Sequence, residues 1–200
     1  VLYMQAASKL LPELIAGFRA QHPEIRLAII QEERPHSAQW DVCITSSRFS
    51  RPTARNRTLL RESILLAVPR DHPLAAKEQV RLESAANAPF IALHKGKALR
   101  ELTDEYCRMA GFEPDIEVES DNPNVIRDLI NLGIGVSMIP EITWHAREYD
   151  RQGNIKTLPI ASPACKRYIN LITPQRSYKP QAVQQFEDFL VAYFQQLQAD

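Results

Sequence analysis

The chain has 200 residues, 44% of them hydrophobic and 24% charged, which is the composition of an ordinary globular protein. Its 24 Lys and Arg residues equal its 24 Asp and Glu residues in number, so the formal net charge is zero. This balance disfavours a segment that holds DNA by itself. The sequence contains no run of about 18 apolar residues, so no membrane contact is expected.

Three cysteines occur, at positions 43, 107 and 165, and their spacing matches neither a metal site nor a CxxC motif. We expect buried thiols without disulfides, which favours a reducing compartment. No signal peptide is visible, and the first residue, Val1, is not methionine. We therefore interpret the chain as a fragment of a longer protein.

Short apolar runs predict strands, and apolar residues at helical spacing predict helices. The expected strands cover 1–4, 25–30, 41–45, 58–60, 63–68, 90–93, 116–119, 135–139, 154–158 and 166–173. The expected helices cover 10–22, 78–86, 98–110, 123–132, 141–149 and 180–198. The strands at 58–60 and 63–68 are interpreted as a pair, and Met109 is expected to face inward from its helix. Four arginines lie in the loop before residue 58, and either contact with an acidic partner or a plain solvated loop explains them.

Two breaks, near residues 69–73 and 159–163, enclose a middle block with its own alternation of strands and helices. This pattern predicts an α/β protein with two Rossmann-like subdomains and a double crossover of the chain. The first lobe would cover 1–70 plus 164–200, and 71–163 would form an inserted second lobe. A ligand would bind in the crevice at the carboxyl ends of the strands.

The stretch from Ser120 to Pro140 carries a full set of local signals for a helix followed by a strand. Asp121 or Asn122 can cap the helix, and Pro123 fits its first position because proline lacks the N–H that would be unpaired there. Gly133 is expected to end the helix. Such a start offers N–H groups and a partial positive charge to an anion, although it also makes sense as an ordinary helix start.

Four polar turns each follow a predicted strand, at residues 5–8, 45–47, 94–97 and 120–122. Hydroxyls, amides and N–H groups at helix starts can hold a small carboxylate without catalysing any reaction, and ordinary turn chemistry is the alternative. The five histidines are scattered, and no catalytic, nucleotide-binding or metal-binding motif occurs. We predict no catalytic residue, no metal and no cofactor.

Four segments, 10–23, 41–44, 68–74 and 132–140, occur in an order that resembles the effector-binding domain of LysR-type transcriptional regulators. The resemblance covers essentially the whole chain. It implies a fold like that of type-2 periplasmic binding proteins, a cytoplasmic sensor without catalysis, and a missing N-terminal winged helix-turn-helix that binds DNA. Positions that match the family's effector-contacting turns are Ala7 and Ser8, Ser46 and Ser47, His94 and Lys95, and Asn122 and Pro123.

The resemblance also implies a homodimer or higher homo-oligomer, with helix 10–20 of one copy against helix 125–132 of another. The sequence departs from the family in the segment 32–40, which is too short for the usual helix, and at Tyr3-Met4, where a glycine is usual. We expect the effector to be a small anionic metabolite. A periplasmic-type solute-binding protein, or an enzyme on the same two-lobed fold, is the alternative, and the sequence upstream of Val1 would distinguish them.

Overall fold

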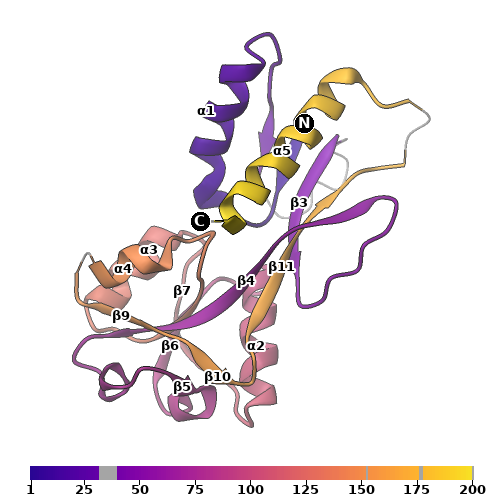
Figure 1. Ribbon diagram of the computed structural model, residues 1–200. Coiled ribbons are helices and arrows are strands. Elements are labelled where there is room, and N and C mark those ends of the chain that lie inside the picture. Colours follow the sequence, from indigo (N-terminus) through magenta and orange to yellow (C-terminus); the bar gives the residue numbers. More distant parts are fainter. Residues whose placement is uncertain (32–39, 152, 176–177, 200) are drawn as a thin grey trace. The chain divides into compact units, whose positions relative to one another are not determined.

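The computed structural model describes residues 1–31, 40–151, 153–175 and 178–199 (Figure 1). The segment 32–40, expected to be shortened, therefore lies almost wholly outside the described residues. The α-helices are α1 (Leu11–Gln21), α2 (Ala98–Met109), α3 (Pro123–Asn131), α4 (Ala146–Arg151) and α5 (Gln181–Ala199). Three 3-10 turns are η1 (Ser8–Leu10), η2 (Pro73–Ala76) and η3 (Leu82–Ala85). The strands are β1 (Leu2–Met4), β2 (Ile29–Ile30), β3 (Val42–Ser47), β4 (Asn56–Pro69), β5 (Val80–Arg81), β6 (Pro89–Ala92), β7 (Asp115–Glu119), β8 (Ser137–Pro140), β9 (Ile155–Leu158), β10 (Ile160–Ser162) and β11 (Lys166–Ile172).

The chain divides into two compact α/β units. Unit 1 consists of Val1–Arg61 and Tyr168–Asp200, and unit 2 consists of Glu62–Arg167. Strands β4 and β11 contribute residues to both units, so the chain passes between them twice. The passages lie at 61/62 and 167/168, whereas the sequence placed the lobe boundaries at 70/71 and 163/164; the lobe assignment itself stays a prediction.

Unit 1 is built on a sheet with the strand order β2-β1-β3-β11-β4. Strand β1 is parallel to both β2 and β3, as the strand–helix–strand order of the sequence predicts, and β11 is antiparallel to β3. Helices α1 and α5 pack together through aromatic rings: the Phe18 ring lies 4.8 Å from that of Phe186 and 5.4 Å from that of Phe189. Gly17 permits this approach, because a Cβ there would lie 3.2 Å from the Phe189 ring.

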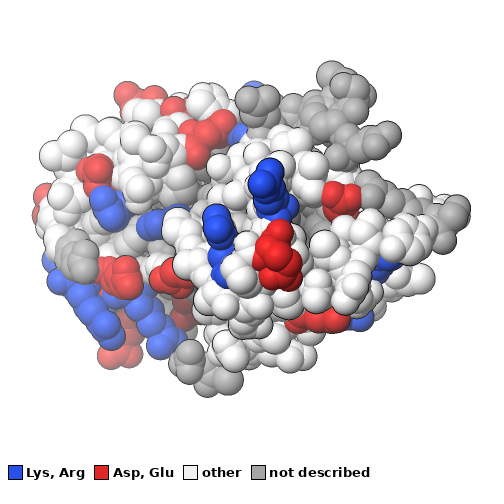
Figure 2. All heavy atoms as spheres, turned by 90° about the horizontal axis from the view of Figure 1, so that it is seen from above, with Lys and Arg blue, Asp and Glu red and all other residues white. Residues whose placement is uncertain are grey.

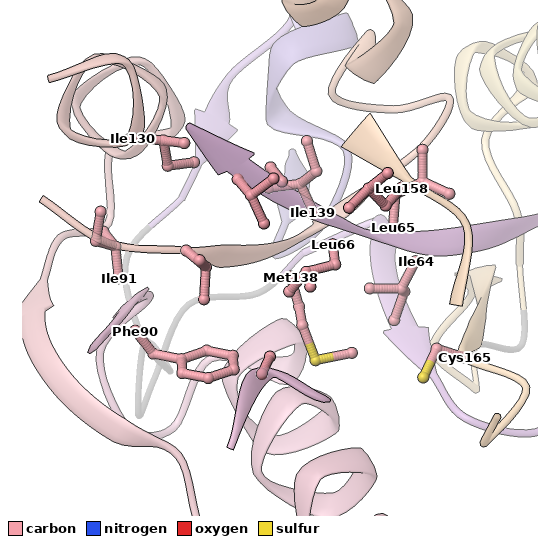
Figure 3. Close-up of a cluster of buried hydrophobic side chains, with 14 of the residues drawn as sticks. Ile64, Leu65, Leu66, Phe90, Ile91, Ile130, Met138, Ile139, Leu158 and Cys165 are labelled. Atoms are coloured by element: carbon pink, nitrogen blue, oxygen red, sulfur yellow. The ribbon is translucent and has the colours of Figure 1, made fainter. Parts of the chain in front are cut away.

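Unit 2 places the end of β4 between β8 and β9, both antiparallel to it, while β6 and β7 form a parallel pair. Its core is a cluster of buried side chains from these strands and the surrounding helices (Figure 3). Leu66 on β4, Phe90 on β6 and Met138 on β8 are each at most 3% exposed. The apolar runs of the sequence therefore correspond to strands buried on both faces, as expected for an α/β domain.

Four expectations about local structure are wrong. The strand pair at 58–60 and 63–68 is a single strand, β4, because Glu62, which looks like part of a turn, is buried and ion-paired with Arg167 at 2.8 Å. Residues 78–86 form β5 and η3 instead of a helix, because Val80 N donates to Pro159 O and pairs the segment with β10. Met109 is 50% exposed, and the expected turn at 45–47 belongs to β3.

Several further elements are shorter than expected. The strand at 25–30 is confined to Ile29–Ile30, and the helix at 141–149 begins only at Ala146. Residues 141–145 form turns that end with His145 in a left-handed conformation, at φ 53°. The apolar residues of these segments are packed by tertiary contacts, which local spacing does not reveal.

Candidate functional site

Two of the predicted site residues, Ala7 and Ser8, follow β1 in unit 1. Strands β1 and β3 are parallel, with Met4 opposite Ile44, so their carboxyl ends lie at the same edge of the sheet. Gln5 N donates a hydrogen bond to Ile44 O at 2.8 Å, which holds the segment after β1 against the end of β3. The first-lobe residues therefore come from neighbouring strand ends, as the sequence predicts.

Ala7 has a left-handed backbone, with φ 60° and ψ 27°, immediately before η1 and α1. An alanine in this region is strained by about 1–2 kcal/mol, because its Cβ crowds the following carbonyl. No side chain caps the start of η1. The N–H groups at such a start have no partner within the helix and are available to an anion.

Ser46 and Ser47 end β3, opposite Ile169 and Tyr168 of β11, and their hydroxyls have different surroundings. Ser47 Oγ donates to Phe49 O and accepts from Asn170 Nδ2, both at 2.8 Å. Ser46 is only 8% exposed, and its Oγ is buried without any hydrogen-bond partner. The Ser47 hydroxyl is thus used inside unit 1, whereas that of Ser46 is unsatisfied.

The other predicted residues lie in unit 2, at the ends of the parallel strands β6 and β7. Ala92 pairs with Glu119, and Ser120 N donates to Ala92 O at 3.0 Å, which extends the ladder past both strands. Asp121 joins the two turns that follow, since its Oδ1 lies 3.1 Å from both the backbone N and Nδ1 of His94. The structure therefore brings the 94–97 turn and the 120–122 turn together.

The start of α3 is capped as the sequence predicts, with Asn122 and not Asp121 at the N-cap. Asn122 Oδ1 accepts from Asn124 N at 2.9 Å, and Ser120 Oγ accepts from Asn122 N at 3.2 Å. Pro123 occupies the first helical position, where it removes no hydrogen bond. Gly133, at φ 79°, follows the end of the helix.

Asp121 is a site residue that sequence reasoning considered only as a possible cap. Its partial burial acts to raise its pKa, but the hydrogen bonds from His94 and the charge of Lys97, whose Nζ lies 3.6 Å away, lower the pKa below its usual value. The linear sequence gives no signal for this contact, because His94 and Asp121 lie 27 positions apart. Within the described part of the chain, no carboxylate forms an ion pair with Lys95.

A polar hollow of about 670 Å³ lies beside Lys95, within unit 2. Arg100 crosses it, with its Nε 2.9 Å from Asp104 Oδ1 and its Nη1 bonded to Leu93 O and Glu119. The lining residues are Lys95, Arg100, Asp104, Arg108, Glu113, Pro114, Ile116, Glu117 and Glu119. Because both signs of charge alternate here, the hollow presents no single-sign field, and the face drawn in Figure 2 likewise intersperses basic and acidic residues.

All three cysteines lie within the described residues, buried and without a disulfide, as predicted. Burial raises the pKa of Cys43 to about 11 and that of Cys107 to about 12, so both remain protonated thiols at neutral pH. Among the residues that the structure describes, no group of three His, Cys, Asp or Glu side chains could hold a metal ion. No described helix is long and apolar enough to cross a membrane.

Two α/β units joined by two strands, with polar turns at the strand ends, define the fold of a ligand-binding domain. The chain belongs to the family described as the LysR substrate binding domain, whose model matches residues 3–195. It is 29% identical over 201 residues to the transcriptional dual regulator GltC of Bacillus subtilis, covering 96% of this chain and 65% of that protein. It is 33% identical over 147 residues to the HTH-type transcriptional regulator cbl of Klebsiella aerogenes, covering 70% of this chain and 46% of that protein.

Solved structures show the same fold. The effector binding domain of QuiR in complex with shikimate is 22% identical, with a TM-score of 0.76 over 98% of this chain and 95% of that one. The CcmR regulatory domain of Synechocystis PCC6803 in complex with 2-PG is 19% identical, with a TM-score of 0.81 over 96% of this chain and 95% of that one. These matches confirm the predicted effector-binding domain and its fold resembling that of periplasmic binding proteins.

Proposed function

We propose that this effector-binding domain senses a small anionic metabolite, held by Ala7, Ser8 and Ser46 of the first lobe. The observation that carries the proposal is the unsatisfied hydroxyl of Ser46. Leaving a buried polar group without a partner costs about 1–3 kcal/mol, and a ligand oxygen would remove that cost. The strained backbone of Ala7 beside a helix start supports the same assignment, because such strain concentrates at functional sites.

The second-lobe residues complete the proposed site: His94, Lys95, Asn122 and Pro123. Lys95 has no carboxylate partner, and the capped start of α3 contributes a partial positive charge. Both features favour an anion. Shikimate, bound by the QuiR domain, is itself a small carboxylic acid. We propose that Ser47 contributes through the shape of β3, since its hydroxyl is already engaged.

The whole protein is proposed to be a cytoplasmic transcriptional regulator that binds DNA through a domain outside this chain. The chain spans 65% of the length of GltC and 64% of that of YybE, two of the regulators that it matches. Regulator relatives favour a sensor over the alternatives of a solute-binding protein or an enzyme. The net charge of zero supports a division of labour in which another domain holds the phosphates.

Self-association is proposed to use α3 against α1 of a second copy. Around α3, Val125 is 40% exposed, Leu132 is 73% exposed and Ile134 is 41% exposed, more apolar surface than one buried face requires. Ile130 is fully buried and serves the core. Leu132→Glu should shift a dimer to monomer in sedimentation without unfolding the chain; a wild-type chain that is monomeric at tens of micromolar would contradict the proposal.

A thermal-shift screen tests the site, with shikimate and other small carboxylates as probes. A ligand at about a hundredfold excess over its dissociation constant should stabilise the chain by about 2.7 kcal/mol, a melting shift of several degrees. Ser46→Ala and Ser8→Ala should lose the shift while melting close to wild type without ligand. A shift that persists undiminished in both variants would place the ligand elsewhere.

A further inference from the structure

The connection between β3 and β4 has the most one-sided charge in the chain. Residues 48–57 contain four of the 24 Lys and Arg residues and none of the 24 Asp and Glu residues, so the remainder carries four more acidic than basic residues. Arg51, Arg55 and Arg57 are exposed, and among the described residues none of the three forms an ion pair with a carboxylate. We call residues 48–57 the arginine loop; Figure 1 draws it as the long purple connection after β3.

The arginine loop is held in one conformation by its own hydrogen bonds. Thr53 N donates to Asn56 O at 2.8 Å, and Asn56 Nδ2 donates to Arg51 O at 3.0 Å. Arg55 Nη1 donates to Gln175 Oε1 at 3.1 Å, which ties the tip to the segment after β11. A fixed backbone reduces the entropy lost on binding, so the arginines are presented in advance of any partner.

An aromatic ring stands among the arginines. Phe49 is 52% exposed, and the guanidinium carbons of Arg48 and Arg51 lie 4.8 Å and 5.9 Å from the centre of its ring. These are cation–π contacts, which orient the guanidinium groups over the ring. Exposed aromatic residues beside arginines are the composition of energetically dominant residues in protein–protein interfaces.

We propose that the arginine loop is a docking surface for an acidic segment of another protein. Guanidinium groups bind carboxylates in a bidentate manner, and the loop uses only arginine, with no lysine. Nucleic acid fits less well, because tracking a phosphate backbone needs a basic stripe, whereas this chain is neutral and its basic charge is confined to one loop. The partner would neutralise Arg51, Arg55 and Arg57 and cover Phe49.

The test is a titration of the chain against a fluorescein-labelled peptide made only of Glu, Asp and Leu, followed by fluorescence anisotropy. Binding should saturate at about 50 mM salt and weaken at least about tenfold at about 300 mM, because exposed charges are screened. The triple variant R51E/R55E/R57E should weaken binding at least about tenfold. Phe49→Ala should weaken it a few-fold with the same salt dependence, since the ring carries no charge.

The matched control is R81E/R108E/R147E, which makes the same change in charge at three exposed arginines of unit 2. It should bind the peptide about as well as wild type, and the melting temperature of each variant should match wild type. No binding at low salt, or an equal loss in the control, would overturn the proposal. Tighter, loop-dependent binding of mixed-sequence duplex DNA would overturn the partner class, as would conversion of a dimer to monomer by the R51E/R55E/R57E variant in sedimentation.

Discussion

Two buried polar regions of this molecule differ in how completely their hydrogen bonds are made. In unit 2, Glu62 is fully buried; its Oε1 accepts from Arg167 Nε and Thr143 Oγ1 at 2.8 Å, and its Oε2 accepts from the N–H groups of Ile142 and Thr143. In unit 1, Ser46 buries a hydroxyl with no partner. A satisfied buried network stabilises a fold, whereas an unsatisfied group marks a place that another molecule can complete.

The largest expected effect comes from breaking the satisfied region. Glu62→Ala should lower the free energy of unfolding by about 3–5 kcal/mol, because it leaves the Arg167 guanidinium buried without its counter-ion. Urea denaturation followed by circular dichroism measures this change. Glu83→Ala is the control, since the Arg81–Glu83 pair is exposed and worth at most about 1 kcal/mol. Similar losses in both variants would contradict the contrast between buried and exposed pairs.

The two adjacent serines offer the sharpest internal comparison. Ser47→Ala should cost about 1 kcal/mol or more, because it removes the partner of Phe49 O and of Asn170 Nδ2. Ser46→Ala should leave the stability of the unliganded chain unchanged or raise it, because the lost hydroxyl had no partner. Thermal melts of both variants, at roughly 2–4 °C per kcal/mol, separate these outcomes. A loss in Ser46→Ala equal to that in Ser47→Ala would refute the comparison.

A smaller effect is expected where a satisfied polar group is exposed. Asn122→Ala should cost about 1 kcal/mol, because the hydrogen bond from Asn124 N to its side chain caps α3. Asn124→Ala changes the same residue type two positions later, inside the helix, and should be close to neutral or stabilising because alanine favours helix. Denaturant midpoints measure both, and a larger loss for Asn124→Ala would place the cap elsewhere.

The smallest effect is a dependence on pH. The pKa of Asp121 is lowered in the folded chain, so its stabilising contribution is present above its unfolded pKa of about 3.9 and is lost as the pH falls through the folded value. Asp121→Asn should remove this part of the acid destabilisation while leaving stability at pH 7 slightly lower. Melting temperatures of wild type and variant, compared between about pH 3 and pH 6, test the sign: the gap should narrow on acidification.

Where local chemistry dominates, the sequence determined the structure. The Asn122-Pro123 start and Gly133 end of α3 are confirmed because caps and breakers act on their own backbone. The same reasoning placed His94 and Asn122 at neighbouring strand ends, since carboxyl ends of parallel strands share one edge of a sheet.

Tertiary structure decided what depends on partners distant in the sequence. Glu62 lies within a strand only because Arg167, 105 positions later, neutralises it. Ser46 and Ser47 are strand residues because β11 pairs with them, and only that pairing and the bonds around Asn170 show which of the two hydroxyls is unsatisfied. A buried charge or hydroxyl in a sequence resembles a surface residue, because its side chain is polar either way; the partners that make its burial tolerable lie too far along the chain for local patterns to reveal.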